Sequence, residues 1–220
     1  MDKFNSREDL IAALADDLTP VARVKPQHGA LVVAIATLVA ALASIAVFGF
    51  WSGIVAGEAS SHFWITNGLL LMLGIGSTAA LVASALPRVG QRSDAPVWSA
   101  AMLAVLPVAA IISLVSFEGA ESHADALADP TLWYWQCAAF GFAASTLVLA
   151  GAVAFLRRGA PVSLERSGWL AGLAAGALGS VAYGITCPLD SVGHVGIWHA
   201  VPVALGAIAG RIIVPPLIRW

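Results

Sequence analysis

Long apolar runs separated by short polar segments dominate the pattern along this chain. Apolar runs without any Asp, Glu, Lys or Arg lie at 30–51, 64–86, 97–117, 132–156 and 169–187, and a sixth run at 197–217 contains Arg211 as its one charged residue. A helix needs about 20 residues to cross the hydrocarbon core of a bilayer. The runs are apolar on all faces, whereas barrel strands alternate apolar and polar positions over about 10 residues. The pattern therefore predicts an all-α integral membrane protein with a bundle of six transmembrane helices.

The composition agrees with this class. Of the 220 residues, 59% are hydrophobic and 11% are charged, whereas soluble domains carry about 25% charged residues. The net charge of −2 gives no basic excess, so no direct contact with nucleic acid is expected. The run at 30–51 is also too long for the apolar region of a cleaved signal peptide. The lipid bilayer is the expected surrounding of the chain.

The cations predict the orientation of the bundle. All 11 Lys and Arg residues fall in the N-terminal segment, in the second and fourth connections, or at the C-terminal end. They are Lys3, Arg7, Arg23, Lys25, Arg88, Arg92, Arg157, Arg158, Arg166, Arg211 and Arg219. Because cytoplasmic loops carry an excess of Lys and Arg, both termini are predicted to be cytoplasmic.

The predicted spans contain little that suggests catalysis. The first five carry no Asp, Glu, Lys, Arg or His in their cores, and such residues mark ion pathways and proton relays when they occur in membranes. No phosphate-binding loop, metalloprotease or nucleophile-elbow motif is present. We therefore expect a protein that is not an enzyme and that requires no cofactor.

The fifth predicted span has a ridge of small residues. They recur every four positions, at Gly168, Gly172, Gly176, Ser180 and Gly184, and the sixth span has Gly206 and Gly210. Small residues at this spacing allow helix backbones to approach closely. Spans five and six are expected to pack tightly, on each other or across a homo-oligomer.

The chain divides into an N-terminal head, residues 1–29, and a transmembrane domain, residues 30–220. The residue pattern of the head predicts a short amphipathic helix that ends at Pro20. Its apolar stripe consists of Leu10, Ile11, Leu14 and Leu18, and Asp9 flanks this stripe. Helices that lie on membranes favour Lys and Arg on the polar face, and this one is acidic. The stripe therefore indicates a soluble partner with an apolar groove and a basic rim.

Two cysteines are expected at the same depth on the outer side. Cys137 lies shortly after the start of span four, and Cys187 lies at the outer end of span five. His194 and His199 follow, five residues apart, so they can share a ligand only if the chain between them is irregular. A disulfide or redox-active pair, a soft-metal site and simple helix packing all remain open for these residues.

The head reads Asp9-Leu10-Ile11…Leu14…Leu18…Pro20-Val21…Arg23, and the last outer loop reads Cys187-Pro188-x-Asp190-Ser191-x-x-His194-Val195-x-x-Trp198-His199. Together with the six predicted spans, these segments resemble the NrsF family of bacterial inner-membrane anti-sigma factors. The resemblance implies that the head binds an extracytoplasmic-function sigma factor of the sigma F type. It also implies that Cys137 and Cys187 take part in sensing heavy-metal or oxidative stress, with a transient heavy-metal ion as an optional occupant.

An alternative from a different class uses the same residues. A membrane thiol oxidoreductase or metal-handling protein would employ Cys137, Cys187, His194 and His199 on the outer face. Such a protein has no need of an acidic amphipathic head, which favours the anti-sigma factor.

Overall fold

The computed structural model describes residues 7–16, 24–86, 133–191 and 193–219, with a few single positions between 94 and 108. Helices are the only regular elements within these ranges. The helices are α1 (Arg7–Asp16), α2 (Pro26–Phe48), α3 (Gly53–Ala56), α4 (Ser61–Ser84), α7 (Trp133–Leu156), α8 (Leu164–Gly184), the π-helix η1 (His194–Trp198) and α9 (Val201–Leu217). Most of the predicted third span, 97–117, and Leu18 of the head lie outside the described residues.

Membrane-spanning character is present in several of these helices. Four segments of the described chain are long and apolar enough to cross a bilayer: Pro26–Phe48, Ser61–Ser84, Trp135–Leu156 and His194–Leu217. Helix α8 is not among them, because its many Gly and Ser residues lower its hydropathy. The all-helical class is confirmed and these four helices are consistent with a membrane protein, whereas the count of six spans is not confirmed.

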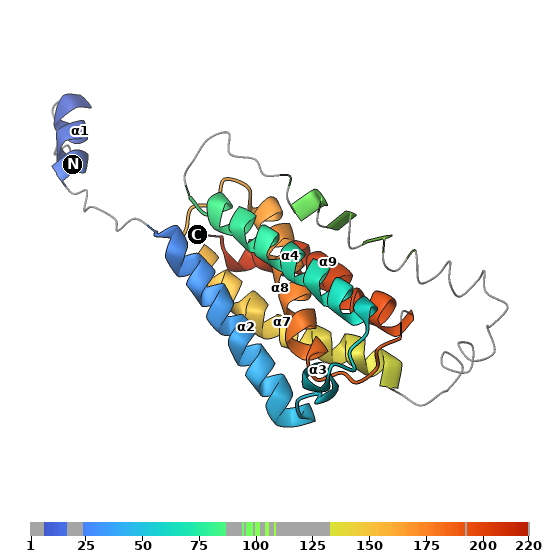
Figure 1. The fold of residues 1–220 in the computed structure, drawn as a ribbon. Helices are drawn as coiled ribbons and strands as arrows, with labels where there is room; N and C mark the ends of the chain where they lie inside the picture. Colours follow the sequence, from blue (N-terminus) through green and yellow to red (C-terminus); the bar gives the residue numbers. More distant parts are fainter. Residues whose placement is uncertain are drawn as a thin grey trace.

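Helix α8 occupies the centre of the bundle. It contacts α2, α4, α7 and α9, and Figure 1 shows these helices arranged around it. Most of its residues are buried, whereas α2 exposes Leu31, Leu38 and Leu42 by more than half. An outer helix that exposes large apolar side chains along its length is suited to contact with lipid.

The small-residue ridge of α8 packs directly against α9. A Cβ atom added at Gly168 would lie 2.6 Å from the carbonyl oxygen of Gly210, and one added at Gly176 would lie 2.6 Å from that of Pro202. A Cβ at Gly172 would collide with the carbonyl oxygen of Gly206. The expected close packing is present, and within one chain it joins α8 to α9.

Pro26 is the first residue of α2, which thus begins before the predicted 30–51 span. Proline suits this position because its fixed φ is already helical and its missing N–H has no partner in the first turn. Helix α9 also continues through Pro215 and Pro216 to Leu217.

The bundle has two distinct ends. At one end, Ser84 of α4 bonds to Ser167 of α8, and the described cations Arg157 and Arg158 follow α7; we call this the basic end. At the other, the chain after α2 meets the end of α8 through a hydrogen bond from Trp51 N–H to Ile185 O. This second end also carries Cys137 and Cys187, and we call it the cysteine end.

Candidate functional site

The two cysteines lie side by side at the cysteine end. Cys137 is in the second turn of α7, and Cys187 follows the last turn of α8. Because α7 and α8 pack against each other in opposite directions, the start of one meets the end of the other. The Sγ atoms are 3.5 Å apart as free thiols, and the two residues are 6% and 2% exposed. The shared depth expected from the sequence is therefore present.

His194 joins this pair from the following segment. Its Nε2 atom lies 3.4 Å from Sγ of Cys187. His194 starts the π-helix η1, and its backbone N–H donates to the hydroxyl of Ser191. In an α-helix, residues five apart point about 140° away from each other. A π-helix closes its hydrogen bonds five residues apart, so η1 brings His194 and His199 to one side, with ring centroids 5.5 Å apart.

His199 completes a cluster of four side chains. One ligand atom from each of Cys137, Cys187, His194 and His199 lies within 4.8 Å of the others, and all four residues are buried. Both ring nitrogens of His199 are buried without a hydrogen-bond partner. We call these residues the Cys₂His₂ cluster.

Two residues that were not predicted as site residues border this cluster. The phenol oxygen of Tyr183 lies 3.4 Å from Sγ of Cys137. Ser180, noted only for its size, donates a 2.6 Å hydrogen bond from its hydroxyl to the carbonyl oxygen of His199. Tyr183 is four residues before Cys187, a spacing that places side chains on one helix face, so this neighbour was accessible to prediction. The Ser180 contact depends on where α9 begins, which the sequence does not give.

A cavity of about 620 Å³ opens onto the thiols. Its lining includes Cys137, Cys187 and Tyr183 together with residues 48–52, which run from the last residue of α2 into the following chain. Small solutes or ions therefore have a space from which to approach the sulfur atoms.

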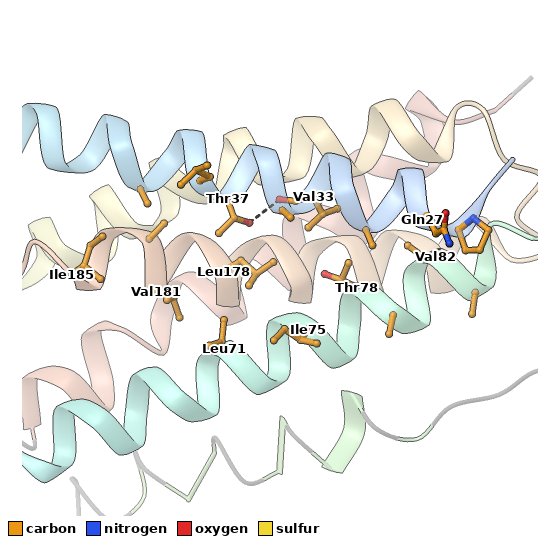
Figure 2. Close-up of a pocket in the computed structure, with 18 of the residues that line it drawn as sticks. Gln27, Val33, Thr37, Leu71, Ile75, Thr78, Val82, Leu178, Val181 and Ile185 are labelled. Carbon is orange, nitrogen blue, oxygen red and sulfur yellow. Dashed lines mark hydrogen bonds between the residues drawn. The ribbon is translucent and has the colours of Figure 1, made fainter.

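A larger apolar cavity lies elsewhere. It has a volume of about 880 Å³ and lies between α2, α4 and α8, with Leu71, Ile75 and Leu178 among its walls (Figure 2). The hydroxyls of Thr37 and Thr78 line it but donate to carbonyls of their own helices, Val33 O at 2.9 Å and Gly74 O at 2.7 Å. It offers few polar groups that could orient a ligand, so the Cys₂His₂ cluster is the better candidate site.

Four of the five predicted partner-binding residues lie on α1. Asp9, Leu10, Ile11 and Leu14 all belong to this helix, and Ile11 and Leu14 are 58% and 61% exposed. Their predicted role in binding a partner stays a prediction.

The fold and the cluster define a helical membrane protein with a buried thiol and imidazole site. The sequence profile of the family NrsF, described as "Negative regulator of sigma F", matches residues 14–220. The chain belongs to this family. It is also 27% identical over 162 residues to the "Probable anti-sigma-F factor NrsF" of Azospira oryzae, with 72% of each chain covered. No solved structure matches the chain.

Proposed function

We propose that this chain is a transmembrane anti-sigma factor that holds an extracytoplasmic-function sigma factor at the bacterial inner membrane. Membership of the negative-regulator family over residues 14–220 is the observation that carries this proposal. Both termini are cytoplasmic in this arrangement, and the protein regulates rather than catalyses. Its partners are the sigma factor and the lipid bilayer, without direct contact to nucleic acid, and a homo-oligomer is compatible with it.

The head, residues 1–29, is the segment proposed to bind the sigma factor. The exposed side chains of Ile11 and Leu14 supply apolar area that an isolated short helix cannot bury. Glu8, Asp9 and Asp16 on the same helix give it acidic flanks, which complement a DNA-binding surface rich in cations. The family match begins at residue 14, so the roles of Asp9, Leu10 and Ile11 rest on the amphipathic pattern alone.

Cys137 and Cys187 are proposed to sense heavy-metal or oxidative stress. Hydrogen peroxide can oxidise the two thiols to a disulfide: the thiols lose two protons and two electrons, and the hydrogen peroxide is reduced to two molecules of water. The Sγ atoms must then approach from 3.5 Å to about 2.05 Å. A soft divalent ion can instead replace the two thiol protons. Formation of the disulfide requires a shift between α7 and the chain after α8.

A contact beside the cysteines supports a route from this site to the head. The backbone N–H of Trp51 donates to the carbonyl oxygen of Ile185 at 3.2 Å, two residues before Cys187. Trp51 follows α2, and α2 begins at Pro26, next to the head. Movement of the chain around Cys187 is proposed to displace α2 and to weaken the grip of the head on the sigma factor.

Co-purification of the sigma factor with the full-length protein from detergent tests the first part. The wild-type chain should retain it, and Leu14→Asp should lose it because a charge enters the apolar stripe. Ala12→Asp is the matched control, since it adds the same charge on the opposite face of α1. Equal retention by both variants would remove the stripe from the interface.

Expression of a sigma-factor-dependent reporter tests the second part. Cys137→Ser and Cys187→Ser should each abolish the response of the reporter to cadmium and to peroxide. Induction that is unchanged in both variants would exclude the thiols from sensing. Metal flux or thiol turnover by the purified chain in proteoliposomes would instead favour a transporter or oxidoreductase.

A further inference from the structure

We infer that the Cys₂His₂ cluster is a closed four-ligand site that holds a resident divalent ion of the Zn²⁺ class when the protein is at rest. The inference deepens the sensing role proposed above and rests on it only for the consequence of losing the ion. The ligand set itself is argued from the geometry of Cys137, Cys187, His194 and His199.

The spacing of the ligand atoms suits a tetrahedral ion. Zn–S bonds of about 2.3 Å and Zn–N bonds of about 2.0–2.1 Å place the ligand atoms of a tetrahedral site about 3.3–3.8 Å apart. The Cys137–Cys187 sulfur separation of 3.5 Å and the separation of 3.4 Å between Cys187 Sγ and His194 Nε2 already fall in this range. The four ligand atoms all lie within 4.8 Å of one another, so a modest rotation of the His199 side chain brings one of its ring nitrogens to bonding distance of the ion.

His199 carries the strongest indication of a ligand. It is 2% exposed, and neither of its ring nitrogens has a hydrogen-bond partner. Burying a polar group without a partner costs about 1–3 kcal/mol in proteins. Coordination of an ion by one of these nitrogens provides a partner, and the hydrogen bond from Ser180 to the His199 carbonyl holds this turn in place.

The donor set determines the class of ion. Thiolate and imidazole ligands select Zn²⁺ and softer ions, whereas Mg²⁺ and Ca²⁺ require oxygen ligands. Four protein ligands leave no open position, which is typical of structural rather than catalytic zinc sites. Binding converts the two thiols to thiolates and releases two protons, so two negative charges balance the divalent ion. A site that is neutral overall is compatible with its deep burial.

Such a site changes what the inducing signal must do. At rest the ion would link α7, the chain after α8 and the segment that leads into α9. A softer ion such as Cd²⁺ would displace it, and oxidation of the thiols would expel it because a disulfide is a poor ligand. Both signals would then act through the same loss of the native ligand arrangement.

Metal binding by the full-length protein, purified in detergent under reducing conditions, tests this inference. We expect about one Zn²⁺ per chain by elemental analysis, consistent with a four-ligand site. Replacement by Co²⁺ should give the ligand-field bands of a tetrahedral ion together with thiolate-to-metal charge transfer. His199→Ala should weaken Co²⁺ binding by about 100-fold or more, because removing a ligand costs at least as much affinity as removing a group that only supports a ligand, which costs roughly 10–100-fold. His199→Cys should keep the tetrahedral bands and add charge-transfer intensity.

His62→Ala is the matched control, because His62 is an exposed histidine at the same end of the bundle. Size-exclusion profiles and helical circular dichroism establish that each variant is folded. Wild-type protein without tetrahedral Co²⁺ bands, or His199→Ala and His62→Ala with equal affinity, would overturn the inference. Sigma-factor retention is measured on the same preparations. If the wild-type protein retains the sigma factor but contains no metal, the resident ion is rejected and the proposed function stands. If it binds the ion but retains no sigma factor, the proposed function is rejected and the metal site stands.

Discussion

The carboxylate of Asp190 accepts two hydrogen bonds from Ser60, one from the backbone N–H at 2.5 Å and one from the hydroxyl at 2.6 Å. The Ser60 hydroxyl also accepts from the N–H of Phe63 and so caps the first turn of α4. Asp190 lies between Cys187 and His194 in the chain. The loop that carries two members of the Cys₂His₂ cluster is therefore fixed to the start of α4.

Asp190→Asn should loosen this connection. The asparagine keeps one carbonyl oxygen but presents an amide to a second donor, and the bonds lose their charge. We expect the free energy of unfolding to fall by about 1–3 kcal/mol, seen as a lower thermal midpoint in detergent by tryptophan fluorescence. Glu58→Gln, at an exposed acid near the same end, is the control and should leave the midpoint unchanged. Equal midpoints for the two variants would show that the contact contributes no stability.

Gly172→Ala should destabilise the bundle. The added methyl group would collide with the carbonyl oxygen of Gly206 and force α8 away from α9. We expect a loss of about 1–3 kcal/mol, the range for overpacked interiors, measured by the same thermal assay. Gly68→Ala in α4 makes the same chemical change where no atom lies within 4 Å of the new Cβ. It should be neutral or stabilising, because alanine favours helix over glycine by about 1 kcal/mol. A destabilised Gly68→Ala together with an unaffected Gly172→Ala would contradict this packing.

Ser180→Ala should release the turn that carries His199. Loss of the hydrogen bond from Ser180 to the His199 carbonyl should cost about 1 kcal/mol and should open access to the thiols. The measurement is the rate at which a small maleimide alkylates Cys137 and Cys187. Ser145→Ala removes another buried hydroxyl, one that bonds within its own helix to Gly141 O at 2.7 Å, and should leave that rate unchanged. Alkylation at the same rate in both variants would refute a positioning role for Ser180.

Accessibility of the thiols should depend on the side of the membrane. The positive-inside rule puts the cysteine end outside, and the cavity of about 620 Å³ gives small reagents a path to the sulfur atoms. A small membrane-impermeant thiosulfonate should therefore label the native cysteines in spheroplasts but not in inverted vesicles. In a Cys137→Ser, Cys187→Ser background, Arg158→Cys at the exposed basic end should show the reverse. Labelling of both positions from the same side would contradict the predicted orientation.

Much of the helical architecture was predictable because it depends on local properties of the chain. Apolar runs long enough to cross a bilayer coincide closely with α4 and α7. The spacing of Gly168, Gly172 and Gly176 indicated close packing, since an absent side chain always permits backbones to approach. The start of α2 at Pro26, before the predicted 30–51 span, does not follow from the apolar run, because proline suits the first helical position whether or not the residues beside it are apolar.

The candidate site was predictable in its parts but not in its geometry. Cys137 and Cys187 lie near the same end of two antiparallel helices, and this was enough to predict that they would lie at the same depth. The approach of His199 was not predictable, because it depends on the π-helix at His194–Trp198 and on the contact with Ser180 from α8. A spacing of five residues separates side chains in an α-helix and aligns them in a π-helix, and the choice between the two is made by surrounding contacts.

The sequence alone determined that this chain is a helical membrane protein, predicted which end carries positive charge, and marked the residues that can bind soft ligands. These properties follow from hydropathy, charge and residue type, which each segment carries wherever it is placed. Only the tertiary structure decided that α8 is central, that its small residues face α9, and that two thiols and two imidazoles converge in one buried cluster. Convergence depends on how helices distant in sequence rotate and stack against each other, and no single segment encodes that arrangement.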